Sequence, residues 1–137
     1  MSVTPQEITK RKLLLGEGKD EINFFSALIR QLGIEDIQVE AYQGKGNLNK
    51  YLQTLRVRPN FNQLTSVGIT RDADENAVQT FQSITDGLRK AKFPIPMKIG
   101  EFIGNRPRIG VFVLPDGQNG GMLEDLCLKV IEANPEI

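Results

Sequence analysis

The sequence predicts an α/β protein with a mostly parallel sheet of four to five strands and helices on both of its faces. Short apolar runs typical of buried strands alternate along the chain with segments of helical spacing, and turns rich in glycine, proline or asparagine separate them. Strands that alternate with helices need crossover connections, which favour a parallel sheet. The chain has 137 residues, a length typical of one domain that can bury a core of its own.

The first third of the chain predicts a strand, a helix and a second strand. Residues 12–15, a lysine followed by three leucines, form a short and mainly apolar run that ends in the turn at 16–18, as a buried strand does. Residues 19–32 then place apolar side chains at steps of three and four, and Gly33 suits a helix C-terminus. Residues 37–42 alternate apolar and polar side chains, which indicates a strand.

The middle of the chain predicts a helix, a strand and another helix. Residues 48–55 carry leucines at helical spacing, and Pro59 stops this helix. Residues 66–70 form the third strand, with Val67 and Ile69 on one face. A strongly amphipathic helix follows within 77–91.

The last third of the chain predicts one central strand, at 108–114, and a final helix over 123–131. The segment 97–102 is ambiguous. It can pair with residues 108–114 as a hairpin and add an antiparallel edge, or run in the other direction. We expect a single domain over 1–137, with its core at about 10–131.

Composition excludes several kinds of catalysis. The chain has no histidine, so catalytic triads, zinc sites with histidine ligands and histidine general bases are excluded. The single cysteine, Cys127, lies in an apolar stretch and suits a small buried hydrophobe. One cysteine forms no internal disulfide, which favours a reducing compartment, and we expect the cytoplasm.

Charge and hydropathy limit the expected partners. Lys and Arg together number 17, as do Asp and Glu, so the net charge is zero and gives no sign of a strongly basic nucleic-acid-binding chain. No apolar run approaches the ~20 residues of a membrane helix. The polar residues 1–9 lack the apolar core of a signal peptide. We therefore expect no membrane partner.

Acidic residues follow the ends of several predicted strands. Glu17 follows the first strand, Asp72 and Asp74 follow the third, and Asp116 follows the last. If the first and third strands are neighbours, their ends lie ~5 Å apart, where two carboxylates repel by ~3 kcal/mol at an effective dielectric of ~20. Mg²⁺ is held by one or two such carboxylates plus water and phosphate oxygens. The sequence therefore predicts a magnesium site at this edge.

Structural roles for the same acids remain open at this point. Asp74 can cap the helix that follows it, and Glu17 can sit on a turn with water as its only partner. Glu124 and Asp125 fall in the first turn of the last helix, where carboxylates stabilise the helix dipole, or they support the acidic site. Basic residues around 45–58 form a solvated surface or a surface that guides phosphate.

Two of these segments resemble the motifs of the Toprim domain shared by topoisomerases, primases and some nucleases. Residues 13–21 are similar to its first motif, a strand ending in Glu-Gly, and residues 67–74 to its second, a strand ending in Asp-x-Asp. Residues 110–126 resemble small stand-alone Toprim-like proteins. The resemblance covers about residues 10–128 and implies a three-layer, Rossmann-like fold.

The resemblance also implies roles for individual residues. Glu17 would be a metal ligand or the general acid/base, and Asp72 and Asp74 would ligate Mg²⁺, with Mn²⁺ as a substitute. Supporting or phosphate-binding roles would fall to four further residues: Lys19, Asp116, Glu124 and Asp125. The partner would be nucleic acid or a nucleotide phosphate, and a homo-oligomer is compatible with the pattern.

The chain departs from the topoisomerase pattern in two ways. Asn76 stands where many topoisomerase members carry a third acid. The only tyrosines are Tyr42 and Tyr51, and we expect no second domain to carry a nucleophilic one. The expected function is therefore a magnesium-dependent nuclease. The alternative is a non-catalytic binding or regulatory module for a nucleotide, a nucleic acid or a partner protein.

Overall fold

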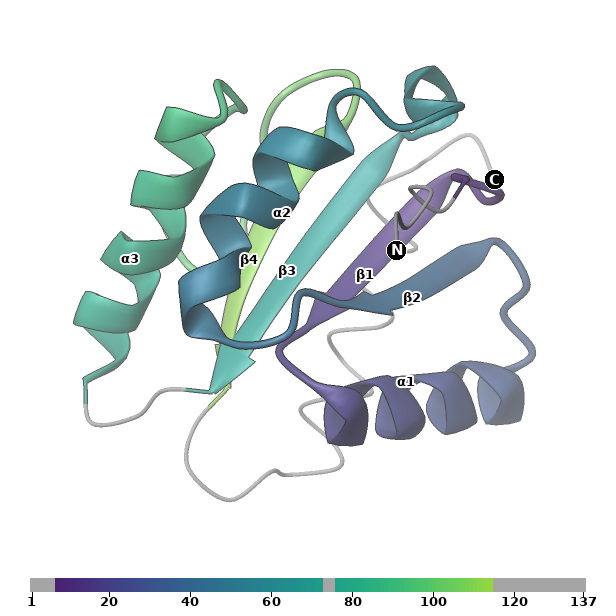
Figure 1. Ribbon diagram of the computed structural model, residues 1–137. Helices are drawn as coiled ribbons and strands as arrows, with labels where there is room; N and C mark the ends of the chain where they lie inside the picture. The colour runs from purple at the N-terminus through teal and green to yellow at the C-terminus, as the bar shows by residue number, and fades with distance from the viewer. Residues whose placement is uncertain (1–6, 73–75, 115–137) are drawn as a thin grey trace, which may run out of the picture.

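A computed structural model describes residues 7–72 and 76–114, with the backbone alone at 45, 72 and 114. Four parallel strands form one sheet in the order β2-β1-β3-β4. The elements along the chain are β1 (Lys12–Gly16), α1 (Lys19–Leu32), β2 (Ile37–Ala41), α2 (Leu48–Leu55), β3 (Ser66–Asp72), α3 (Ala77–Lys90) and β4 (Arg108–Leu114) (Figure 1). The predicted alternation of strands and helices is confirmed.

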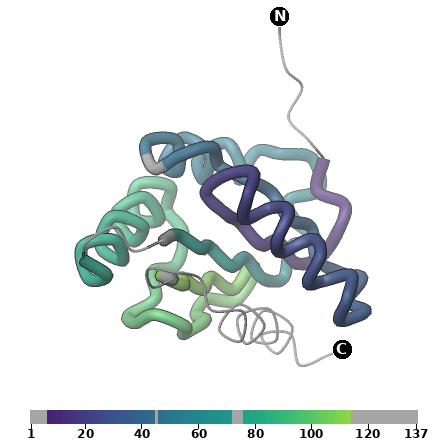
Figure 2. Tube along the Cα trace, turned by 90° about the horizontal axis from the view of Figure 1, so that it is seen from below, coloured from purple at the N-terminus to yellow at the C-terminus, as the bar shows by residue number. Residues whose placement is uncertain are grey.

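Helices cover both faces of the sheet, which gives three layers. In Figures 1 and 2, α2 and α3 lie side by side and α1 lies apart from them. The smaller core lies under α1, where Phe25 and Ile29 pack with Leu14 of β1 and Phe112 of β4. The three-layer Rossmann-like arrangement predicted from the sequence is thus present.

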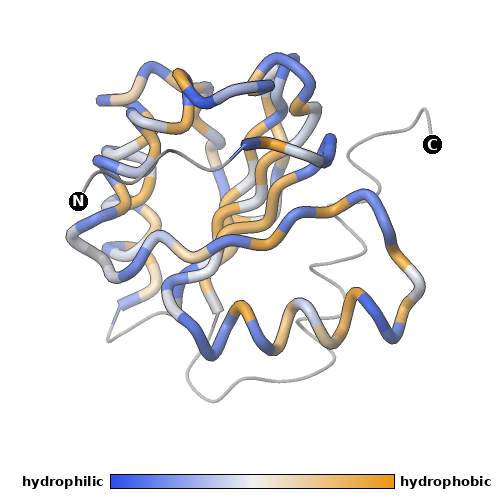
Figure 3. The backbone as a smooth tube through the Cα atoms, turned by 45° about the vertical axis from the view of Figure 1, so that its right-hand side comes forward, coloured by the Kyte–Doolittle hydropathy of each residue, from blue (hydrophilic) through white to orange (hydrophobic). Residues whose placement is uncertain are grey.

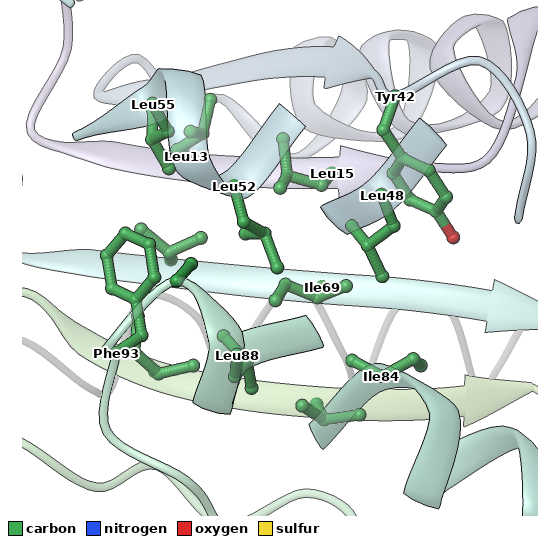
Figure 4. Packing of buried hydrophobic residues seen from close by; sticks show 14 of the residues in the cluster. Leu13, Leu15, Tyr42, Leu48, Leu52, Leu55, Ile69, Ile84, Leu88 and Phe93 are labelled. Atoms are coloured by element: carbon green, nitrogen blue, oxygen red, sulfur yellow. The ribbon is translucent and has the colours of Figure 1, made fainter. Parts of the chain in front are cut away.

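The larger core lies between the sheet and the α2–α3 pair. Alternate residues of β1 and β3 point to this face and meet apolar side chains of both helices (Figure 4), namely Leu13, Leu15, Val67 and Ile69 from the strands and Leu48, Leu52, Leu55, Ile84 and Leu88 from the helices. All nine are at most 2% exposed. Figure 3 shows hydrophobic residues concentrated along the central strands, where both faces are buried.

The outer side of β4 is covered by the chain that precedes it. Ile103 forms an antiparallel bridge with Ile109, and the Gly100 N–H donates to the carbonyl of Val111 at 2.9 Å. Phe102 packs over Gly110, where a Cβ would lie only 2.7 Å from its ring. The segment 97–102, whose direction the sequence left open, forms no strand, and the antiparallel contact is a single bridge at the next residue, Ile103.

Several predictions concern residues outside the described part of the chain. The loop at 116–121, the helix at 123–131 and the burial of Cys127 belong to this group. Within residues 7–72 and 76–114, no helix is both long enough and apolar enough to cross a membrane.

Candidate functional site at the carboxyl edge of the sheet

The topology creates a switch point at the ends of β1 and β3. From β1 the chain crosses to β2 on one side and later to β3 on the other, so the connections leave these two strand ends in opposite directions. Ligands of open parallel sheets bind at such points. The register pairs Leu15 with Ile69. Continued by two residues, it sets Glu17 level with Arg71, one residue before Asp72.

A tight turn after β1 gives Glu17 its position. Gly16 is required because a Cβ there would lie 2.6 Å from the Cβ of Glu21, in the first turn of α1. The Gly18 N–H donates to the Glu21 Oε1 atom at 2.7 Å, which satisfies a backbone donor at the start of the helix. The carboxylate that caps the start of α1 is therefore that of Glu21, and the Glu17 carboxylate takes no part in this cap.

Glu17 is fixed through its backbone while its carboxylate stays available. Its carbonyl accepts hydrogen bonds from the N–H groups of Gln43 at 3.0 Å and Gly44 at 3.1 Å. Both donors have positive φ angles, 67° and 100°, so the turn after β2 is shaped to reach the turn after β1. Among the described residues, the half-buried Glu17 side chain has no hydrogen bond or ion pair.

Buried hydrogen bonds fix the ends of the strands relative to one another. The Thr70 hydroxyl donates to the Leu15 carbonyl at 2.8 Å, which ties β3 to β1. The Tyr42 hydroxyl donates to the Thr70 carbonyl, also at 2.8 Å. Since these groups are buried, losing either bond would leave an unsatisfied polar atom, and the edge is held rigidly.

The start of α3 corrects one structural alternative for Asp74. The helix begins at Ala77, and its cap is Asn76, whose Oδ1 atom accepts from the N–H groups of Val78 at 2.9 Å and Gln79 at 3.2 Å. The alternative in which Asp74 caps this helix is therefore wrong. Because the Asn76 side chain caps the helix, an amide at this position is explained without any role in metal binding.

The structure brings together only part of the predicted acidic site. The backbones of Glu17 and Asp72 end adjacent strands at one edge. The Asp72 side chain and four other predicted residues, Asp74, Asp116, Glu124 and Asp125, lie outside what is described. Among the side chains that are described, no three His, Cys, Asp or Glu residues form a metal-ligating group. Convergence around an ion stays a prediction.

The donor chemistry at this edge suits Mg²⁺. The ion takes oxygen ligands and keeps several waters, so it needs few protein carboxylates. Glu17 offers a partly exposed carboxylate on a fixed backbone, and no described residue pairs with that carboxylate. A second acid, Asp72, ends the neighbouring strand. These residues would hold the ion.

A separate cavity lies beside the edge strand β2. Its volume is about 660 Å³, within the usual range for ligand pockets. Apolar side chains and polar groups line it, including Lys19, Ile22, Val39, Gln43 and Thr54 together with Glu40, Tyr51 and Arg58. None of the described side chains of β3 lines it. Lys19, predicted as a supporting residue, is exposed here and lies two positions after Glu17.

One wall of the cavity is a saturated polar cluster. The Arg58 Nη1 and Nη2 atoms each donate to a different oxygen of Glu40 at 2.7 Å, and the Tyr51 hydroxyl donates to the same carboxylate. Burial alone would raise the pKa of Glu40, but the hydrogen bonds from Arg58 and Tyr51 outweigh it and hold the pKa below its ordinary value. Burial and the nearby Glu40 charge raise the pKa of Tyr51.

Sequence reasoning did not single out Arg71, which is buried at the end of β3. Its Nη1 atom donates to the Ser83 hydroxyl at 3.2 Å, and its buried Nε atom has no hydrogen-bond partner among the described residues. The signal was available, since Arg71 continues the alternation of Val67 and Ile69, which fill the core face of β3. A positively charged side chain at a core-facing position of a strand is unusual.

The fold and its edge define a class: a small three-layer α/β protein with an acidic residue at the switch point of a parallel sheet. A family model described as "Protein of unknown function (DUF3226)" matches residues 11–137, and the chain belongs to this family. No curated protein matches the sequence.

Proposed function

We propose that this protein carries out magnesium-dependent phosphodiester chemistry on nucleic acid, as a nuclease with a Toprim-like site formed by Glu17, Asp72 and Asp74. The observation that carries the proposal is the adjacency of the β1 and β3 ends at the switch point of the sheet. The expected compartment is the cytoplasm.

The available carboxylate of Glu17 supports the proposal further. Glu21 and Asn76 supply the side-chain hydrogen bonds at the starts of α1 and α3, so neither cap competes for Glu17. An unpaired carboxylate that stays partly exposed can hold a cation or accept a proton. Its backbone is fixed by Gln43 and Gly44, which keeps the group in one place.

The chemistry would divide between the acids. Glu17 would accept a proton from the attacking water or hydroxyl, or contribute to holding the cation. Asp72 and Asp74 would hold the cation, and in an extended segment residues two apart face the same way. When bound, Mg²⁺ supplies positive charge that stabilises the phosphate oxygens.

A cleavage assay tests the proposal. Labelled single-stranded and double-stranded DNA and RNA are incubated with the protein in Mg²⁺, Mn²⁺ or EDTA. We expect cleavage that needs the metal and falls at least about 100-fold in Glu17→Gln and Asp72→Asn, the typical contribution of a catalytic acid or base.

Glu35→Gln is the matched control, because Glu35 is an exposed acid on the turn before β2, at the opposite end of the strands. It should cleave at the wild-type rate. No cleavage by the wild type with any of the four substrates would contradict nuclease activity, and equal loss in all variants would indicate a general folding defect.

The cavity beside β2 favours a second candidate, a binding module for a nucleotide. Its apolar lining and few polar groups are typical of small-molecule sites. Titration with nucleoside mono- and triphosphates, followed by calorimetry, tests this function. Binding that disappears in Lys19→Met, together with an absence of cleavage, would favour the module over the enzyme.

A further inference from the structure

Arg71 is a buried cation for which the described residues provide no carboxylate. The residue is only 7% exposed, and its one hydrogen bond within the described chain goes to the neutral hydroxyl of Ser83. A guanidinium has five N–H donors, and here the Nε donor is buried with no acceptor in the described part of the chain. Burying a charge without a partner is costly, so such a group indicates that an anion is missing.

The position of Arg71 makes a core role an inadequate explanation. Val67 and Ile69 precede it on the same face of β3 and are fully buried among leucines of the larger core. An apolar residue at the third position would extend that core without any electrostatic cost. Arg71 instead ends the row at the carboxyl edge, between β3 and Ser83 of α3.

We propose that Arg71 binds a phosphate group at the carboxyl edge of the sheet, where the end of β3 meets α3. The choice of phosphate rests on the proposed function, whose substrate carries such groups. The planar, permanently charged guanidinium is well matched to a phosphate oxygen pair. The ligand would supply the anion that Arg71 lacks.

The test measures phosphate binding in EDTA, so that no metal contributes. The probes are inorganic phosphate, which represents a terminal monoester, and dimethyl phosphate, which represents an internal diester. ³¹P NMR titration gives the affinity, and thermal unfolding at matched ionic strength gives a second readout. We expect at least one probe to bind, and to raise Tm by about 5 °C at ten times its Kd.

Arg71→Met separates a phosphate-binding role from a structural one. Without phosphate this variant should unfold at the wild-type Tm or above it, because an unpaired buried charge is removed. Its affinity should fall about 10–100-fold, the usual loss for a charged hydrogen-bonding group. Arg30→Met, which removes an exposed arginine from the last turn of α1, is the control and should bind as the wild type does.

Two results would overturn the inference: neither probe binds the wild type, or Arg71→Met binds as tightly as Arg30→Met. If Arg71→Met does not fold, Arg71→Gln, which also removes the charge, replaces it, and unchanged affinity in that variant has the same meaning. Failure of the proposed function looks different, because phosphate would still bind in EDTA while no substrate is cleaved with Mg²⁺.

Discussion

Two arginines are buried to the same extent in this protein, and their surroundings differ. Arg58, beside the edge strand, and Arg71, at the end of β3, are each 7% exposed. Arg58 donates to both oxygens of Glu40 and to the hydroxyl of Tyr51. Within residues 7–72 and 76–114, Arg71 has a neutral serine hydroxyl as its acceptor, and its Nε atom has none. Two equally buried arginines therefore differ in their partners: the described residues provide a carboxylate for Arg58 and none for Arg71.

The difference indicates what each region does. The Arg58–Glu40 pair is bidentate, and both carboxylate oxygens accept hydrogen bonds from other residues of the chain. It therefore forms a rigid wall of the β2 cavity. Arg71 lies at the switch point of the sheet, where ligands of such sheets bind, and we propose that a phosphate completes its pairing. The contrast is thus between an arginine that the chain itself pairs with a carboxylate and one that the proposed ligand would pair.

Breaking the Arg58 pair should produce the largest effect. Arg58→Met leaves the buried Glu40 carboxylate without its cation and should lower the free energy of unfolding by about 3–5 kcal/mol. Arg71→Met, measured in the same phosphate-free urea titration, should change it by less than about 1 kcal/mol. Similar losses in the two variants would abolish the distinction between the regions.

Glu40→Gln should lower the free energy of unfolding by an intermediate amount, about 2–3 kcal/mol at pH 7. In this variant Arg58, like Arg71, would be a buried arginine without a carboxylate from the described residues. The pH profile sharpens this test. The pKa of Glu40 lies below its unfolded value, so its stabilisation is present above about pH 4.3 and is lost as pH falls through the folded pKa. The difference in the free energy of unfolding between the wild type and Glu40→Gln should therefore become smaller from pH 5 toward pH 3. A constant difference over that range would show that Glu40 does not titrate as the pairing requires.

Tyr51→Phe should give the smallest change. It removes one donor to Glu40 and one acceptor for Arg58, while the bidentate pair remains. We expect a loss of about 1 kcal/mol in chemical denaturation, the usual value for such hydrogen bonds. A loss as large as that of Arg58→Met would mean that the tyrosine, and not the ion pair, holds the cluster together.

The sequence predicted the elements well because apolar periodicity reports directly on burial. The strand at 12–15, the helix at 19–32 and the strand at 108–114 all form, and the alternation correctly indicated a parallel sheet. The segment 97–102 was harder, since a single bridge at Ile103 depends on the packing of Phe102 over Gly110 and has no periodic signal.

The site was less predictable, because it depends on single residues and on distant pairs. The cap of α3 is Asn76 and not Asp74, a choice decided by backbone geometry at one position. The bond between Arg58 and Glu40 joins residues 18 apart in sequence, which no local pattern reveals. The alternation of β3 places Arg71 on the core face. That no described residue accepts a hydrogen bond from its Nε atom can be seen only in the structure.

Anomalous diffraction from crystals soaked in Mn²⁺ tests most directly whether acids from separate strands share one ion at this edge. A peak within about 2.5 Å of carboxylate oxygens from both Glu17 and Asp72, and absent in Asp72→Asn, is the predicted result. Density that shows the two carboxylates directed apart, with no manganese between them, would contradict the account.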